Sequence, residues 1–228
     1  MLFNSYEFIF AFLPITFFIY FFLNKRRLSE LSKGFLVASS LFFYAWWNIA
    51  YLPIILCSMI FNYCFGMELN KSDVKISKKA ILIVAIAANL ALLGYFKYSD
   101  FLIDNLNFAF NLHIHSLNLL LPLAISFFTF QQIAYLVDSY NGGGTKEYNF
   151  LNYCLFVTFF PQLIAGPIVH HKEVMPQFGN LKNKVPNYKN IALGLFIFSL
   201  GLFKKVLIAD TFAVWASNGF DKAEILSL

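Results

Sequence analysis

The sequence predicts an all-α fold, a polytopic bundle of transmembrane helices, and two observations predict it. Of the 228 residues, 59% are hydrophobic and only 13% are charged, whereas soluble domains carry about 25% charged residues. The apolar residues also come in long blocks and do not alternate with polar ones, which is typical of spanning helices. We therefore expect a single membrane domain over residues 1–228, with the lipid bilayer as its first partner.

Six apolar blocks divide the chain, and a single span needs about 20 residues. The blocks cover residues 6–23, 34–66, 80–96, 117–137, 150–169 and 191–209. The block 34–66 is too long for one span. Its centre reads YAWWNIAYLP, in which the tryptophans suit the headgroup layer and Pro53 suits the first turn of a new helix. Division at this point predicts six or seven membrane segments.

The net charge of +5 arises largely from short basic runs between the apolar blocks. This distribution is typical of loops that stay in the cytoplasm, and it predicts no nucleic-acid partner. The divided block puts the basic loops 24–33 and 67–79 on the same side, with the non-basic residues 97–116 outside. Basic residues follow the block 6–23 and do not precede it, so it is a retained helix and not a secretory signal. We expect a multi-pass protein of the inner (plasma) membrane.

Residues 159–171 read FFPQLIAGPIVHH, an apolar stretch with helix breakers. A complete span at 150–169 would put the basic stretch 170–190 outside, against the positive-inside rule. A segment that is broken, or that enters and returns, removes this conflict. The breakers are Pro161, Gly166 and Pro167.

A proline inside a helix costs about 3 kcal/mol or more. We therefore expect a helix that ends near Phe159 or Phe160, followed by irregular chain through Ala165–Pro167. Irregular backbone is tolerated at membrane depth only where it is buried in protein or lines a wet cavity. The sequence thus predicts that this segment lines a cavity.

Polar side chains also follow the expected helix 117–137. Spacings of i, i+4 and i+7 place Gln131, Tyr135 and Asp138 on one face, and two further polar residues lie on another face. Such a stripe faces either a partner helix or a substrate path, and both readings stay open. The candidate tunnel-lining residues of this helix are Ser126, Thr129, Gln131, Tyr135 and Asp138.

Four histidines are the candidates for chemistry. Either His170 or His171 could act as a general base, because the unperturbed histidine pKa lies near ~6.5. Neighbours on a helix point about 100° apart, so at most one can face a given site. No acidic or hydroxyl partner is identifiable from spacing, and interfacial packing or a loop is the alternative. His113 and His115 lack a third ligand, so no metal site is expected.

Other motifs carry little chemistry. The turn NGGGT at residues 141–145 lacks the lysine of a phosphate-binding loop. An odd number of cysteines without CxxC spacing excludes a disulfide framework, so we expect them to be small core residues. These are Cys57, Cys64 and Cys154.

Five stretches, taken in order, resemble the bacterial branch of the membrane-bound O-acyltransferase family. They are FNSYEFIFAFLPI, SSLFFYAWWN, LLGYFKYSDF, LPLAISFFTFQQIAYLVDSY, and FFPQLIAGPIVHHKEVMPQF followed by GLFKKVLIAD. The resemblance covers the chain from Met1 to about Ala213. The alginate-type subgroup looks most similar.

The resemblance implies an O-acyltransferase that moves an acyl group, by default acetyl, across or through the membrane. The implied donor is acetyl-CoA or an acyl carrier in the cytoplasm, with no bound cofactor. The implied acceptor is an exported or cell-wall polysaccharide, alginate-like or peptidoglycan, reached directly or through a periplasmic or extracellular acetyltransferase. In the family, helices surround a tunnel, and a histidine at its waist acts on the acceptor hydroxyl.

That histidine lies beyond the stretch that matches GLFKKVLIAD, and no histidine of this chain aligns with it. We therefore expect an N-terminal part that lacks the catalytic region beyond Leu228 and is inactive without a C-terminal half or second chain. It would be a truncated product, one part of a split gene, or a fragment. Two alternatives stay open: a transporter or channel subunit, which would share the intramembrane polar residues, and an inactive truncated scaffold.

Overall fold

The computed structural model describes residues 1–71, 77–142, 149–166 and 171–220, and these are helical, with no strand among them. The predicted all-α fold class is confirmed. The first half contains η1 (Phe8–Phe12), α1 (Leu13–Lys25), α2 (Ser29–Ala45), η2 (Ile49–Tyr51), α3 (Leu52–Asn70) and α4 (Lys78–Phe110). The second half contains α5 (Ile125–Tyr140), α6 (Phe150–Thr158), α7 (Phe160–Ala165), α8 (His171–Gly179), η3 (Leu181–Lys184), α9 (Tyr188–Phe203), η4 (Lys204–Ala209) and α10 (Asp210–Phe220).

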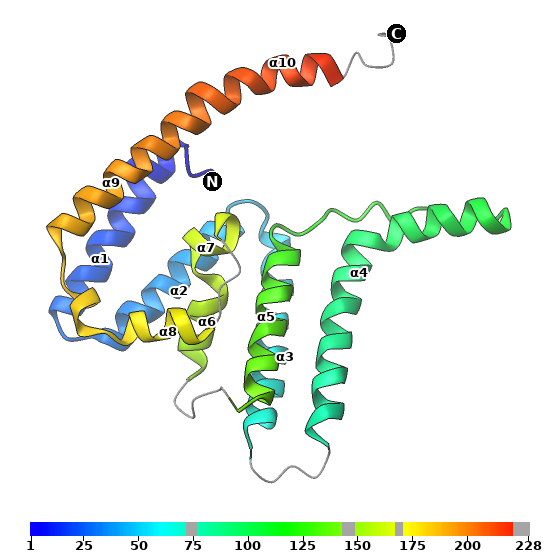
Figure 1. The fold of residues 1–228 in the computed structure, drawn as a ribbon, viewed down its shortest axis with the longest axis horizontal. Helices are drawn as coiled ribbons and strands as arrows, with labels where there is room; N and C mark the ends of the chain where they lie inside the picture. Colours follow the sequence, from blue (N-terminus) through cyan, green and yellow to red (C-terminus); the bar gives the residue numbers. More distant parts are fainter. Residues whose placement is uncertain (72–76, 143–148, 167–170, 221–228) are drawn as a thin grey trace.

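Two packed groups of helices meet at α6 (Figure 1). In one group α5 packs against α3 and α4, and in the other α2 packs against α1 and α6. The core between them contains Tyr44 of α2, Ile55 of α3, Phe128 of α5 and Phe156 of α6, none more than 1% exposed. Helix α6, which precedes the predicted helix breakers, therefore lies at the centre of the described helices.

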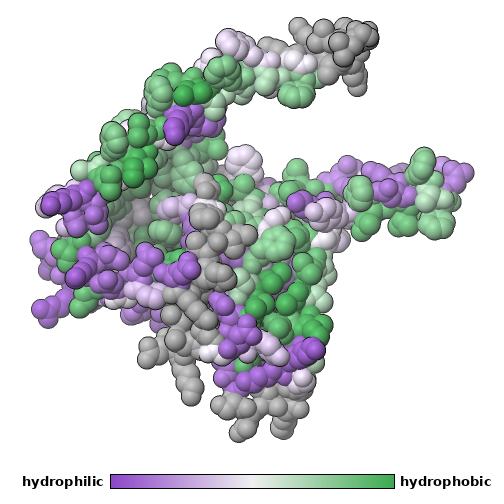
Figure 2. Space-filling view, in the orientation of Figure 1, coloured by the Kyte–Doolittle hydropathy of each residue, from purple (hydrophilic) through white to green (hydrophobic). Residues whose placement is uncertain are grey.

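Four helical stretches are long and apolar enough to cross a membrane. They are Phe8–Lys25, Ile49–Asn70, Lys78–Phe110 and Tyr188–Ser217. At most a third of the most apolar window in any of them is buried within the protein. Their apolar side chains therefore face outward, as they do where the surroundings are lipid, and much of the surface of α9 is apolar (Figure 2). The expected number of six or seven segments stays a prediction.

The predicted division of the block 34–66 is confirmed. Helix α2 ends at Ala45, and α3 begins with Pro53 in its first turn. Between them, the Asn48 side chain accepts a hydrogen bond of 2.9 Å from the Ala50 N–H, which caps the short helix η2. A local capping residue and a proline suited to a helix start produce the turn.

Two boundaries predicted in the middle of the chain are wrong. Residues 97–110 are not a loop, because α4 continues to a left-handed Asn111 (φ 54°) that ends it. The helix predicted over 117–137 begins only at Ile125. Pro122 biases the residue before it away from helical geometry, and Ala124 adopts a left-handed conformation (φ 57°).

The last helix is longer than the predicted block 191–209. The helices α9, η4 and α10 follow one another without a gap from Tyr188 to Phe220 and form the long curved rod of Figure 1. Lys204 and Lys205 lie in the π-helical turn η4, where Lys205 pairs with Asp210. In this pair the charge of Lys205 is balanced by a carboxylate of the same apolar rod.

Two of the three cysteines are not core residues. Cys154 is buried, as predicted, but Cys57 and Cys64 are exposed. The two positions are seven residues apart, about two helical turns, and so lie on one outer face of α3. In a spanning helix this face meets lipid or another helix. Because both cysteines are exposed, a label can be attached to either of them.

Candidate functional site

At the junction between α6 and α7, the helical hydrogen bond between Phe160 and Phe156 is open, and two side chains replace it. In an unbroken helix the Phe160 N–H would bond to the Phe156 carbonyl. Instead, the Phe160 N–H donates to Ser40 Oγ at 3.3 Å, and the Phe156 carbonyl accepts from Gln131 Nε2 at 2.8 Å. Ser40 and Gln131 are both 0% exposed. A side chain of α2 thus satisfies the donor of the open bond, and a side chain of α5 satisfies its acceptor.

The course of the broken segment agrees only in part with the prediction. The expected end of the helix near Phe159 is confirmed, because α6 ends one residue earlier and Phe159 leaves helical geometry (φ −49°, ψ 109°). The irregular chain expected up to Ala165 is wrong, because these residues form α7. Pro161 falls in its first turn, where a proline loses no hydrogen bond. Gly166 is extended, and Pro167 lies outside the described residues.

Aromatic rings fix the position of α7. The ring of Phe160 lies 5.1 Å from Phe12 and 5.5 Å from Phe43, measured between centroids. Phe8 also contacts this group, at 6.1 Å from Phe160. Edge-to-face aromatic pairs contribute about 0.5–1.5 kcal/mol beyond their buried area. The first residue after the break is therefore anchored between η1 and α2.

An open cavity of about 680 Å³ lies beside the break. Residues of α1, α2, α7 and α8 line it, and most of its wall is apolar. Its polar lining residues are Thr16, Tyr20, Gln162, Gln177 and Asn183. Gln162 Nε2 is buried without a hydrogen-bond partner. A Cβ atom on Gly166, another lining residue, would lie 2.7 Å from Gln162 Cα, so only glycine fits this rim.

Other polar atoms near the centre also lack partners. Among the described residues these include Tyr44 Oη, Thr129 Oγ1 and Gln131 Oε1, all buried. A buried polar atom without a hydrogen bond costs about 1–3 kcal/mol, and water or a ligand commonly satisfies it. The interior around α5 is therefore able to accept further hydrogen bonds.

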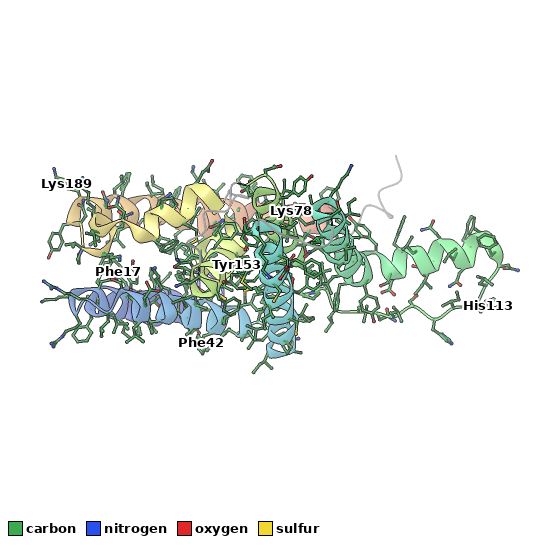
Figure 3. The ribbon with its side chains drawn as sticks, turned by 90° about the horizontal axis from the view of Figure 1, so that it is seen from below. Phe17, Phe42, Lys78, His113, Tyr153 and Lys189 are labelled. Carbon is green, nitrogen blue, oxygen red and sulfur yellow. The ribbon has the colours of Figure 1, made fainter. Side chains whose placement is uncertain are left out.

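A second polar cluster joins four helices below the surface. Asn62 Nδ2 of α3 donates to Asn89 Oδ1 of α4 and to Gln132 Oε1 of α5, both at 3.0 Å. Gln132 Nε2 donates to Ser58 Oγ at 3.0 Å, and Tyr153 Oη of α6 donates to Gln132 Oε1 at 2.9 Å. Figure 3 shows Tyr153 near the middle of the molecule. We call these five residues the amide cluster, and its bonds between helices account for their fixed register.

The structure separates the residues predicted on α5. Thr129 and Gln131 are 0% exposed and Tyr135 is 6% exposed, while Ser126 and Asp138 are half-buried. The ring of Tyr135 packs against that of Tyr153 at 4.6 Å. The face predicted for Gln131 and Tyr135 is thus turned toward partner helices. That these residues also line a substrate path stays a prediction.

Two of the four histidines lie away from the break. His113 and His115 are exposed, and His113 lies at the far end of the molecule (Figure 3). His170 lies outside the described residues, and His171 begins α8. Within the described ranges, no three His, Cys, Asp or Glu side chains could hold a metal ion.

The prediction missed six residues that organise the interior. Ser40 bonds at the break, and the other five form the amide cluster. Each is a polar side chain within an apolar block, which is expensive unless it is paired. That signal was available in the sequence, but the partners lie up to 120 residues apart along the chain.

Residues 143–228 match the model of the membrane-bound O-acyltransferase family. The chain is 49% identical to the peptidoglycan O-acetyltransferase of Helicobacter pylori, over 100% of this chain and 48% of that protein. It is 36% identical to the probable alginate O-acetylases AlgI of Pseudomonas aeruginosa and Pseudomonas putida, over 96% of this chain and 42% and 45% of those proteins. The chain spans about half the length of these curated relatives. No solved structure matches it significantly.

The identity is higher to the peptidoglycan relative than to the alginate relatives, although the motifs favoured the alginate-type subgroup. The matches cover all the stretches on which the resemblance rests. The resemblance is confirmed: this chain is related to the membrane-bound O-acyltransferase family, and it matches the N-terminal half of those relatives.

Proposed function

We propose that this chain is part of a membrane O-acyltransferase that acetylates a hydroxyl group of an exported or cell-wall polysaccharide. The likeness along the whole chain to a peptidoglycan O-acetyltransferase favours peptidoglycan as the acceptor. The inner membrane is the proposed location, and an acetyl-CoA or acyl-carrier donor in the cytoplasm is the proposed acetyl source. A periplasmic or extracellular acetyltransferase is a proposed partner.

One observation of the structure carries this proposal: an open cavity beside a helix break that buried side chains hold open. An apolar wall with few convergent polar groups is typical of small-molecule sites. Gln162 lines this wall, and its Nε2 is a buried hydrogen-bond donor without a partner. An acyl group presents an apolar tail and one carbonyl acceptor, and these complement the wall and the donor. In this proposal the chain binds and orients the acyl group, and no described residue is assigned as the base.

The test is a chimera. Residues 1–228 replace the corresponding part of the Helicobacter pylori relative, and the chimera is expressed in cells that lack their own peptidoglycan O-acetyltransferase. We expect O-acetylated peptidoglycan, measured as acetate released by mild alkali. The control is the same chimera with Gln162→Leu. A chimera that is inserted and stable in the membrane but leaves peptidoglycan unacetylated contradicts peptidoglycan as the acceptor.

A transporter or channel subunit is the second candidate, because the polar residues within apolar helices also suit a conduction path. The same chimera separates the two. An acyl donor labelled in its acetyl carbon transfers the label to the glycan in an acyltransferase. Movement of labelled acetate across vesicles without any labelled glycan, in the presence of acceptor, supports the transporter instead.

A further inference from the structure

The C-terminal part of α4 and the chain that follows it form a hairpin, residues 97–118, which we call the arm. Asp100 Oδ1 accepts hydrogen bonds from the N–H groups of Leu117 and Asn118, at 2.6 and 3.3 Å. The Asn107 side chain bonds to both the N–H and the carbonyl of Ile114, at 2.9 and 2.8 Å. These bonds across the hairpin define its shape without support from any other helix.

The helix of the arm bonds to the returning chain through polar residues and leaves large apolar side chains exposed. Asp100, Asp104 and Asn107 lie at i, i+4 and i+7, and all three bond to the returning chain. The large side chains of the arm's helix are left exposed: Phe101 is 64%, Phe108 93% and Phe110 69% exposed, and Leu102 and Leu106 are 55% and 44% exposed. In Figure 2 the arm extends to the right, with purple and green side chains both visible along it.

The orientation of the arm suggests what covers this apolar surface. Figure 1 shows that the arm turns away from the upright part of α4 and runs sideways, roughly across the direction of α3 and α5. The upright part includes the apolar block 80–96, whose length of about 25 Å approaches the thickness of the hydrocarbon core. The arm therefore leaves the helix near the membrane surface. Tyr95 and Tyr98, both about half-exposed, flank the start of the arm at residue 97, and aromatic residues commonly occupy the headgroup layer.

We propose that the arm lies in the plane of the membrane surface and inserts its phenylalanines and leucines at the boundary between headgroups and acyl chains. The partner is the lipid surface itself. The two carboxylates of the arm bond to its own backbone or side chains and do not meet the acyl chains. An amphipathic helix in this position buries its apolar face about 5–10 Å into the interface. The arm would thereby fix the depth and tilt of α4.

The experiment measures depth by spin labelling in the full chain, reconstituted in phosphatidylcholine vesicles. The background carries Cys57→Ala, Cys64→Ala and Cys154→Ala, and single cysteines replace Leu102, Leu106 or His113. A variant that keeps only Cys57, on the outward face of α3, gives the reference for acyl-chain depth. Collision with oxygen reports the apolar phase, and collision with a water-soluble nickel complex reports the aqueous phase.

We expect labels at positions 102 and 106 to show an oxygen-to-nickel ratio several-fold above that at position 113 and below that at Cys57. Ratios at 102 and 106 equal to that at 113 would place the arm in water and overturn the proposal. A second copy of the chain would instead shield the labels, so that both reagents collide with them rarely. The spectra would then also broaden through interaction between labels, and the broadening would increase with the ratio of protein to lipid. This outcome would assign the surface to a second copy. Dilution with unlabelled protein separates that outcome from simple immobilisation.

Discussion

Lys184 Nζ donates a hydrogen bond to Ser29 Oγ at 3.1 Å, although the two residues are 155 positions apart. Beside them, a hydrogen bond from Lys33 lowers the pKa of Glu30, and Asn149 and Lys184 act in the same direction. Asn149 caps the start of α6, and Lys184 lies beyond its broken continuation. The start and the continuation of the segment therefore both lie near the N-terminus of α2, as a segment that enters the membrane and returns requires.

The first prediction concerns this topology. Single cysteines at Arg27 and Lys184, in a background without other cysteines, should react with a membrane-impermeant maleimide from the same side. A cysteine at His113 should react from the opposite side, because α4 crosses the membrane between them. The measurement is labelling of intact cells compared with inverted vesicles. Labelling of position 184 from the side of position 113 would contradict the returning path.

The second prediction concerns the opened hydrogen bond. Gln131→Leu leaves the Phe156 carbonyl without the Gln131 bond inside the protein, at a cost of about 1–3 kcal/mol, which removal of the unpaired Gln131 Oε1 offsets in part. The matched control is Thr129→Val on the same helix, which removes a hydroxyl that has no hydrogen-bond partner and should not lower stability. Thermal unfolding in detergent measures both. Equal midpoints for Gln131→Leu and the unchanged chain would show that the bond does not hold the break.

The third prediction uses glycines as a test of packing. A Cβ atom on Gly66 would lie 2.7 Å from Tyr135 Cζ, whereas one on Gly94 meets nothing within 4 Å. Gly66→Ala should therefore destabilise the protein by about 1–3 kcal/mol, as overpacking does. Gly94→Ala should be neutral or stabilising by up to about 1 kcal/mol. If both variants unfold at the same denaturant concentration, α3 and α5 are not in close contact.

Local signals predicted the turn between α2 and α3, because these signals, the two tryptophans and Pro53, lie within a few residues of it. The same kind of signal was ambiguous at Pro161, since a proline ends one helix or begins another, and the sequence does not decide which. The helix of the arm was predicted as a loop because it carries Asp100 and Asp104. Those carboxylates bond to the chain that folds back along the helix, and the sequence alone does not show that the chain folds back there.

The amide cluster could not have been predicted from spacing. Asn62 and Ser58 are one helical turn apart, and this fits a polar pair on any helix surface. Their partners Asn89 and Gln132 come from two other helices. Which polar residue meets which depends on the register between α3, α4 and α5. That register follows from packing throughout the core and not from a local motif.

The fourth prediction concerns this cluster. Tyr153→Phe removes the bond to Gln132 Oε1 and keeps the ring. We expect a loss of about 0.5–1.5 kcal/mol in unfolding free energy. Tyr6→Phe is the control, because Tyr6 is 80% exposed and should not change stability. A double variant with Gln132→Leu tests coupling: if the two losses simply add, the residues do not interact.

The last prediction separates function from stability at the cavity. Gln162 Nε2 is buried without a hydrogen-bond partner, so Gln162→Leu should keep the fold and raise stability by about 1 kcal/mol. If the amide orients the acyl carbonyl, the same variant should reduce O-acetylation by the chimera about tenfold, the value of one hydrogen bond of about 1.4 kcal/mol. Gln177→Leu is the matched control, because this amide lines the same cavity but donates to the Glu173 carbonyl within α8. Acetate release and the thermal midpoint are measured on the same preparations. Unchanged acetate release by a stable Gln162→Leu chimera would remove the residue from the acyl site, and a reduced midpoint would show that the amide is bonded within the protein.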